Sequence, residues 1–304
     1  MKNKEGSGQN RPHIEIMRVG GRLLRVAVWK GEAAAHGAGP LPLLFFNGIG
    51  ANIELMSPLA DWFPDRDLIT FDMPGVGGSP KSVTPYRPWT MARTAARLLE
   101  MLGYDKVDVM GVSWGGGLAQ QFAFQHSKQV GRLVLAATSA GVIMVPGDIR
   151  SLSKMADPRR YIDPDFMRKN FQVLYGGETG GAESHIDRIT APSRTGYLLQ
   201  LAAMSGWTSV PFLPLVKAPT LVMMGDDDRI VPLINGKLLA RLIPNAKLEI
   251  VPGGGHLFLV SRASEVAPRI RSFLDEPAAA SKPGSTRQRR RWQASAKESP
   301  AMAA

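Results

Sequence analysis

The sequence has 304 residues, of which 44% are hydrophobic and 21% charged, and its formal net charge is +11. It contains no cysteine, which excludes a disulfide framework and a thiolate metal site. The polar stretch 1–10 lacks the apolar segment of a signal peptide, and no apolar run reaches the ~18 residues that span a bilayer. We therefore expect a cytoplasmic protein with no integral membrane segment.

The excess positive charge is concentrated near the C-terminus. From Lys282 onward the chain carries six basic residues and one acid, so this stretch supplies five of the eleven net charges. Its other residues are mainly Ser, Ala, Pro and Gln, which bury too little apolar surface to offset the entropy of ordering. We expect 277–304 to be a disordered basic tail. Nucleic acid is not the expected partner, although the charge of the tail leaves binding to it or to another anionic surface open.

Strand and helix patterns alternate along the first half of the chain. Residues 13–19 and 22–28 alternate between apolar and polar around two glycines, which is typical of a β-hairpin. Continuous apolar runs, expected of strands buried on both faces, occur at 41–46, 68–71, 106–110 and 132–137. Helical spacing occurs at 55–62, 91–102 and 117–123. This order predicts a parallel sheet with right-handed crossovers.

The alternation stops between 141 and 215, where Asp-Pro steps, a glycine cluster and helical apolar patches replace it. It resumes with strands at 220–224 and 247–251 and helices at 233–242 and 264–273. The pattern predicts an α/β fold with a mostly parallel, doubly wound sheet. Its core is expected to consist of 1–140 and 216–276, and 141–215 to be an inserted helical cap.

A serine follows one of the predicted strands in the stretch Gly111-Val112-Ser113-Trp114-Gly115. This matches the G-x-S-x-G nucleophile elbow, a tight turn that pushes a hydroxyl out of the sheet at the N-terminus of a helix. An ordinary turn would have the same glycines, so the strand before it and the helix after it carry the assignment. Ser113 is the predicted nucleophile.

A serine hydroxyl needs a base and an orienting acid, which in doubly wound hydrolases follow it in the order acid, histidine. Of the five histidines, His256 alone lies beyond the last predicted strand, in a glycine-rich loop. Three aspartates, Asp226, Asp227 and Asp228, follow the strand at 220–224, at the sheet edge where such folds place active sites. We choose Asp228 as the orienting acid; the alternative for this residue is a helix cap, and we expect the other two to cap the next helix or to be solvated.

The tetrahedral intermediate needs donors for its oxyanion. We predict the backbone N–H of Trp114 as one donor and that of Ile49, in the turn 47–50, as the other, with Asn47 shaping that turn. The glycine-rich stretch 75–79 has no lysine at P-loop spacing, and the histidines show no zinc-ligand spacing. We therefore expect no metal and no cofactor.

Together these stretches resemble the α/β-hydrolase-fold serine esterases, through 71–79, the elbow, 225–232 and 255–256. More narrowly, the chain resembles the intracellular depolymerases of medium-chain-length polyhydroxyalkanoate. The stretches that carry this likeness are 46–52, 111–122, 135–138, 144–147, 158–161, 206–209 and 256–259. The resemblance implies that Ser113, Asp228 and His256 are the catalytic triad and that the substrate is an aliphatic polyester stored as granules. Gly253 and Gly254 depart from it, because acidic residues and a shorter loop are expected there.

The leading hypothesis is therefore a serine hydrolase that cleaves poly(3-hydroxyalkanoate) through an acyl-enzyme and releases 3-hydroxy acids or oligomers. A cap rich in Met, Leu, Tyr and Trp fits a hydrophobic polyester or any other lipophilic ester, and exposed apolar residues would fit a granule surface. An esterase, lactonase or acyltransferase on small lipophilic acyl compounds is the first alternative. The second is a granule-binding protein without turnover.

Overall fold

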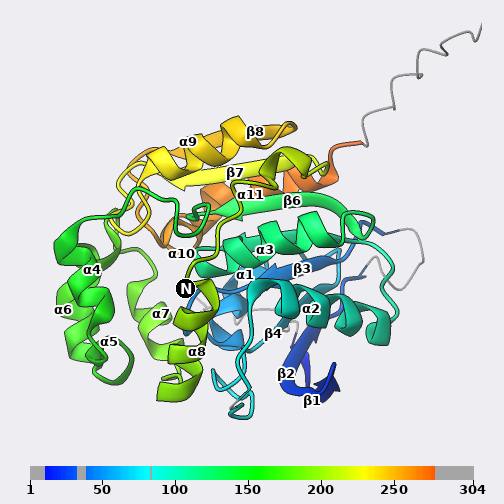
Figure 1. The fold of residues 1–304 in the computed structure, drawn as a ribbon. Coiled ribbons are helices and arrows are strands. Elements are labelled where there is room, and N and C mark those ends of the chain that lie inside the picture. Colours follow the sequence, from blue (N-terminus) through cyan, green and yellow to red (C-terminus); the bar gives the residue numbers. More distant parts are fainter. Residues whose placement is uncertain (1–10, 33–38, 83, 278–304) are drawn as a thin grey trace, which may run out of the picture.

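The structure, a computed structural model, describes residues 11–32, 39–82 and 84–277 (Figure 1). The predicted disordered tail lies outside the described residues, apart from its first residue. The strands are β1 (His13–Val19), β2 (Arg22–Trp29), β3 (Leu43–Phe46), β4 (Leu68–Phe71), β5 (Val107–Val112), β6 (Val130–Ala136), β7 (Thr220–Gly225) and β8 (Ala246–Val251).

These strands form one sheet of eight in the order β1-β2-β4-β3-β5-β6-β7-β8. Neighbours from β4 to β8 pair in parallel, whereas the β1–β2 hairpin is antiparallel and joins the sheet through an antiparallel β2–β4 pair. Strands β3, β4 and β7 are buried along their whole length, as uninterrupted apolar runs require when both faces are covered. The predicted α/β sheet is confirmed.

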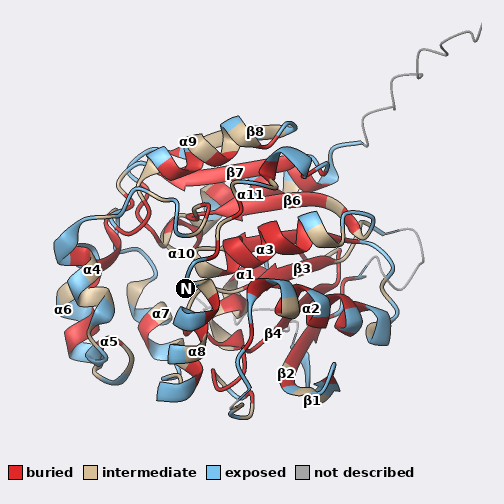
Figure 2. Ribbon diagram, in the orientation of Figure 1, coloured by how far each residue is buried: buried red, intermediate tan, exposed pale blue. Residues whose placement is uncertain are grey.

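The helices of the core are α1 (Ser57–Ala60), α2 (Pro88–Leu102), α3 (Trp114–Gln125), α9 (Leu233–Leu242), α10 (Phe258–Ser261) and α11 (Ala263–Asp275), with a short 3-10 helix η2 (Ile53–Met56) before α1 and another, η3 (Leu213–Leu215), before β7. Helices α2, α3 and α9 supply one apolar core, on one face of the sheet, and α1, α10 and α11 supply the other. Figure 2 shows the buried strands between these two layers. The helix predicted at 55–62 is instead split between η2 and α1, with proline at the second position of α1.

Five further helices lie between β6 and β7: α4 (Ile149–Ala156), α5 (Arg159–Ile162), α6 (Pro164–Tyr175), α7 (Ala182–Arg188) and α8 (Arg194–Met204). They gather at one end of the sheet (Figure 1). The chain leaves and re-enters the core at one place, because Gly141 forms a bridge with Thr208 and the backbone N–H of Val142 donates to the carbonyl of Trp207 over 2.9 Å. We call these five helices the cap.

Candidate active site

The elbow joins β5 to α3 with almost no space between the two backbones. Ser113 has φ 53° and ψ −122°, a conformation that costs a non-glycine residue on the order of 1–3 kcal/mol. A Cβ on Gly111 would lie 2.4 Å from the carbonyl oxygen of Gly115, and one on Gly115 would lie 2.1 Å from that of Phe46 in β3. Only glycine fits at both positions, so the strain at Ser113 is held in place by close packing on either side.

Ser113, His256 and Asp228 form one hydrogen-bonded chain. The Ser113 Oγ lies 3.0 Å from Nε2 of His256, and Nδ1 of the same ring lies 2.8 Å from Oδ2 of Asp228. A carboxylate only accepts, so Nδ1 donates to it and Nε2 is free to accept the serine proton. The three residues follow β5, β7 and β8, all parallel strands, at the carboxyl edge of the sheet.

The carboxylate of Asp228 is fixed on both oxygens. Its second oxygen, Oδ1, accepts the backbone N–H groups of Ile230 and Val231, each over 2.9 Å, and the side chain is fully buried. Three donors, the Nδ1–H of His256 and these two backbone N–H groups, thus hold the carboxylate in one orientation. It can therefore orient the imidazole and stabilise its protonated form.

The other two aspartates hold neighbouring loops. Asp226 accepts the backbone N–H of Gly253 over 2.6 Å, and Asp227 accepts that of Gly177, at the start of the α6–α7 loop, over 2.7 Å. They were predicted to cap the next helix or to be solvated. The first alternative is wrong, because the N-terminus of α9 has no side-chain cap, whereas Asp226 is exposed and Asp227 partly so. We call the loop 252–257, which carries His256, the histidine loop. The two aspartates together bind this loop and the cap to the end of β7.

The glycines around His256 allow three backbone segments to touch. A Cβ on Gly255 would lie 2.3 Å from the Gly176 carbonyl oxygen, and one on Gly225 would lie 2.0 Å from that of Gly254. The backbone N–H of His256 also donates to the carbonyl of Tyr175, over 2.6 Å. Gly253 and Gly254, where the resemblance leads one to expect acidic residues, thus lie where the backbones of the histidine loop, β7 and the cap are in close contact.

The turn after β3 lies beside the serine. Asn47 accepts the backbone N–H of Gly48 over 3.0 Å and donates from its amide to the Asn52 carbonyl over 2.9 Å, which closes the turn on itself. Ile49 and Gly48 line the same cavity as Ser113. Trp114 is the first residue of α3, so its backbone N–H belongs to the first turn, where helices have no internal acceptor.

Two residues of the cap form hydrogen bonds to the backbone of the turn 47–50. The Tyr161 hydroxyl donates to the Ile49 carbonyl over 3.1 Å, and the Gln200 side-chain oxygen accepts the Gly50 N–H over 2.8 Å. The indole N–H of Trp114 donates to the Gln200 carbonyl over 3.0 Å. Sequence reasoning assigned no role to Tyr161 or Gln200, because neither lies in a motif that indicates contact with the turn.

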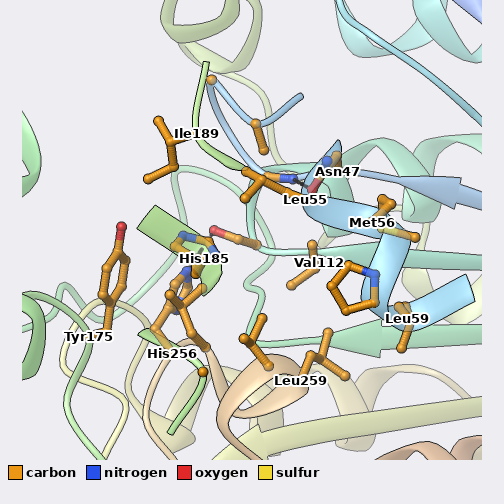
Figure 3. A pocket seen from close by; sticks show the side chains of 18 of the residues that line it. Asn47, Leu55, Met56, Leu59, Val112, Tyr175, His185, Ile189, His256 and Leu259 are labelled. Carbon is orange, nitrogen blue, oxygen red and sulfur yellow. Dashed lines mark hydrogen bonds between the residues drawn. The ribbon is translucent and has the colours of Figure 1, made fainter. Parts of the chain in front are cut away.

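The site opens into a cavity of about 230 Å³. Figure 3 shows Leu55, Met56, Leu59, Val112 and Leu259 on one side, and Tyr175, His185 and His256 together on the other. The first group forms an apolar wall suited to an aliphatic chain. The volume of the cavity exceeds the ~150 Å³ of a cavity that holds benzene. The second group comes from the cap and the histidine loop.

His185, in α7, contributes no charge to the cavity at neutral pH. Burial, and then the nearby Arg188 and Arg160, lower the pKa of His185 to about 4. The ring packs edge-on against Phe171 and Tyr175. It is therefore a neutral part of the wall.

In the described ranges, no group of three or more His, Cys, Asp or Glu side chains is arranged to hold a metal ion. No helix among these residues has both the length and the apolar character needed to cross a bilayer.

The fold and the geometry of this site define an α/β hydrolase, and the comparisons with known proteins agree. The family model described as alpha/beta hydrolase fold matches residues 42–176 and 178–263. The chain belongs to this family. The solved esterase of Exiguobacterium antarcticum superposes with a TM-score of 0.71 over 85% of this chain and 98% of that one, at 20% identity, and so shares the fold.

Two relatives of known activity are more similar in sequence to this chain than the solved esterase is. The chain is 48% identical over 240 residues to a poly(3-hydroxyalkanoate) depolymerase of Ectopseudomonas oleovorans, which covers 77% of this chain and 84% of that protein. It is 31% identical over 226 residues to a 2-hydroxymuconate semialdehyde hydrolase of Pseudomonas putida, covering 69% and 78%. The resemblance to polyhydroxyalkanoate depolymerases drawn from the sequence is confirmed by the first of these.

Proposed function

We propose that this chain is a serine hydrolase that cleaves the ester bonds of medium-chain-length poly(3-hydroxyalkanoate) and releases 3-hydroxy acids or short oligomers. The observation that carries the proposal is the hydrogen-bonded chain Ser113–His256–Asp228 at the mouth of a largely apolar cavity. The 48% identity to a depolymerase supports the choice of substrate.

In the first half-reaction Ser113 Oγ attacks the ester carbonyl while Nε2 of His256 takes its proton. The ester C–O bond then breaks, and His256 gives the proton to the departing alkoxide. In the second half-reaction a water molecule attacks the acyl carbon while His256 takes its proton. The bond from that carbon to Ser113 Oγ then breaks, His256 returns the proton to Oγ, and the acid leaves. Asp228 keeps the imidazole in the required tautomer throughout and stabilises its positive form.

The oxyanion of each tetrahedral intermediate is proposed to accept the backbone N–H groups of Ile49 and Trp114. The Ile49 turn is closed by Asn47 and held by Tyr161 and Gln200. Such fixed donors need no reorganisation when charge develops, which is the source of their effect. Two of the contacts come from the cap, so the cap would influence turnover as well as binding.

The apolar wall formed by Leu55, Met56, Leu59 and Leu259 is proposed to hold the aliphatic side chain of a 3-hydroxyalkanoate unit. Each methylene that leaves water for such a wall contributes about 0.8 kcal/mol. A medium-length side chain thus gains several times this amount over a methyl group.

We further propose that the protein works on cytoplasmic storage granules, which the cap contacts directly. Several large apolar side chains of the cap are exposed, including Ile149 (75%), Ile162 (68%) and Leu198 (62%). Contact with an apolar phase would remove these side chains from water, which is favourable.

The second candidate function is hydrolysis of small lipophilic esters. The modest volume of the cavity, about 230 Å³, favours it, because a small ester would fit without a polymer channel. A protein that binds granules without turnover is a third candidate, and the intact Ser113–His256 hydrogen bond argues against it.

Granules of medium-chain-length polymer and a soluble ester such as p-nitrophenyl octanoate separate these candidates. The proposed function predicts acid released from the granules, identified by mass spectrometry. An esterase of small compounds would hydrolyse only the soluble ester, and a binding protein would hydrolyse neither.

A further inference from the structure

One buried cation lines the cavity without an acidic partner. The side chain of Arg160, in α5, is on the cavity wall with Ser113 and His256, and the residue is only 5% exposed. Within the described residues it forms no ion pair with Asp or Glu. The other two buried arginines of the described residues are both paired: Arg66 with Asp108 and Asp275, and Arg132 with Glu276.

The contacts of Arg160 are neutral. Its guanidinium donates to the hydroxyls of Tyr161 and Tyr197, the second over 3.2 Å, and its other terminal nitrogen lies 3.6 Å from the sulfur of Met155. Burial raises the pKa of the Tyr161 hydroxyl above its ordinary value, so this group supplies no negative charge. A buried charge without a counter-ion is costly, which points to an anion that binds here.

The rest of the described cavity wall supplies no acidic side chain to neutralise Arg160. Among its described lining residues there is no Asp or Glu, and His185 is neutral at neutral pH. The wall therefore combines one permanent positive charge with a broad apolar surface. A ligand that fits both is an aliphatic molecule with a single carboxylate, which guanidinium groups bind well.

The position of Arg160 places this charge near the reacting bond. Its guanidinium contacts the Tyr161 hydroxyl, which in turn donates to the Ile49 carbonyl in the turn beside Ser113. Two hydrogen bonds thus separate Arg160 from that turn. In a 3-hydroxy acid unit a single CH2 group separates the carbon that bears the ester oxygen from the carboxyl carbon, so a terminal carboxylate also lies close to the bond that is cleaved.

We propose that Arg160 binds the free carboxylate at the end of the polyester, so that units are removed from the carboxyl end. This inference rests on the proposed function. Ser113 Oγ bonds to the carbonyl carbon of the penultimate unit, the ester C–O bond breaks, and the terminal 3-hydroxy acid leaves with a proton from His256. Water then hydrolyses the acyl-enzyme and frees a shortened chain with a new carboxylate end.

The first test is inhibition of p-nitrophenyl octanoate hydrolysis by 3-hydroxyoctanoate and by its methyl ester, which lacks the charge. The full chain is expected to bind the acid at least tenfold more tightly than the ester. Arg160→Met, which keeps length and removes charge, should lose this preference, and Arg160→Lys should recover part of it. Arg159→Met is the matched control, because Arg159 is exposed and paired with Asp157; it should retain the full preference.

The second test compares kcat/KM for the 3-hydroxyoctanoate dimer as free acid and as methyl ester. Arg160→Met is expected to lower the value for the acid 10- to 100-fold more than the value for the ester, with the extra loss appearing mainly in KM. Equal losses for both substrates would make Arg160 a structural residue and overturn the proposal. So would equal inhibition of the unaltered chain by acid and methyl ester, a result that needs no variant to fold. Failure to release acid from granules would instead refute the proposed function.

Discussion

At the scale of single residues, the three aspartates after β7 have three different tasks. Asp228 is hydrogen-bonded to the His256 ring, Asp226 to the backbone of the histidine loop, and Asp227 to the backbone of the cap. Only the first of these contacts involves a side chain that moves a proton in the proposed mechanism. The other two place a carboxylate oxygen against a backbone N–H, a bond that an amide oxygen can also accept.

This difference predicts the effect of the three Asp→Asn changes. Asp228→Asn should lower kcat on a soluble ester by about 10⁴-fold, because an amide favours the wrong imidazole tautomer. Asp226→Asn and Asp227→Asn should leave kcat within about tenfold of the unaltered chain. Steady-state kinetics on the three variants measure this, and a comparable loss in all three would show that the loop, and not the His256 contact, limits the rate.

The sequence predicted some of these residues better than others. Ser113 lies in a motif, and chain order together with the strand ends narrowed the choice to His256 and Asp228, which the structure brings within hydrogen-bond distance. Arg160 and Gln200 face the same site, but they come from cap helices where the pattern carries no information about direction. Their contacts depend on how the cap sits on the core, which no local pattern encodes.

At the scale of elements, the elbow depends on the contact between α3 and the neighbouring strand β3. A Cβ at position 115 would meet the backbone oxygen of Phe46 at 2.1 Å and that of Asn47 at 2.4 Å. Backbone atoms cannot rotate away as a side chain can. The two elements would have to separate, at the very turn that is proposed to bind the oxyanion.

Gly115→Ala is therefore expected to destabilise the fold by roughly 1–3 kcal/mol or more, as overpacking does. Gly48→Ala is a suitable control, because a Cβ at position 48 would have the Ser113 Cβ as its nearest neighbour, at an ordinary 3.8 Å. The loss of unfolding free energy in this variant should stay under ~1 kcal/mol. Urea unfolding of both variants measures the difference. Equal stabilities would mean that strand and helix can part without cost.

The elements themselves were largely predictable. Apolar/polar alternation predicted β1 and β2, and short, mainly apolar segments predicted the other six strands. The αL conformation of Gly103, with φ 80°, ends α2 at the expected residue. Errors of one to three residues occurred at helix starts, as at α3, which begins at Trp114 and not at Gly117. The first turn of that helix is not recognised from the sequence, because it contains Gly115, Gly116 and Gly117 and glycine is a poor helix former.

At the scale of the whole molecule, the site lies between the sheet edge and the cap, so the outer surface of the cap is what a granule would meet. Leu198 and Leu201 are 62% and 47% exposed on α8. They are three residues apart, and so they share one face of that helix. The same helix contributes Gln200, which holds the turn beside Ser113.

Replacing both leucines with serine should weaken binding to polymer granules about tenfold or more, because each buried leucine contributes roughly 1.5–3 kcal/mol. Sedimentation with granules measures the bound fraction, and hydrolysis of a soluble ester should change little. Ile16→Ser with Met101→Ser is the matched control, since both residues are more than half exposed and lie outside the cap, on β1 and in the last turn of α2. An equal loss in the control would point to general stickiness and not to docking by the cap.

Whether Ser113 cleaves polyester is tested by the release of 3-hydroxy acids from medium-chain-length granules, measured for the unaltered chain and for Ser113→Ala. We expect steady release by the first and a loss of about 10⁶-fold in the second, with unchanged thermal unfolding and unchanged sedimentation with the granules. Release by Ser113→Ala at a comparable rate would contradict this expectation.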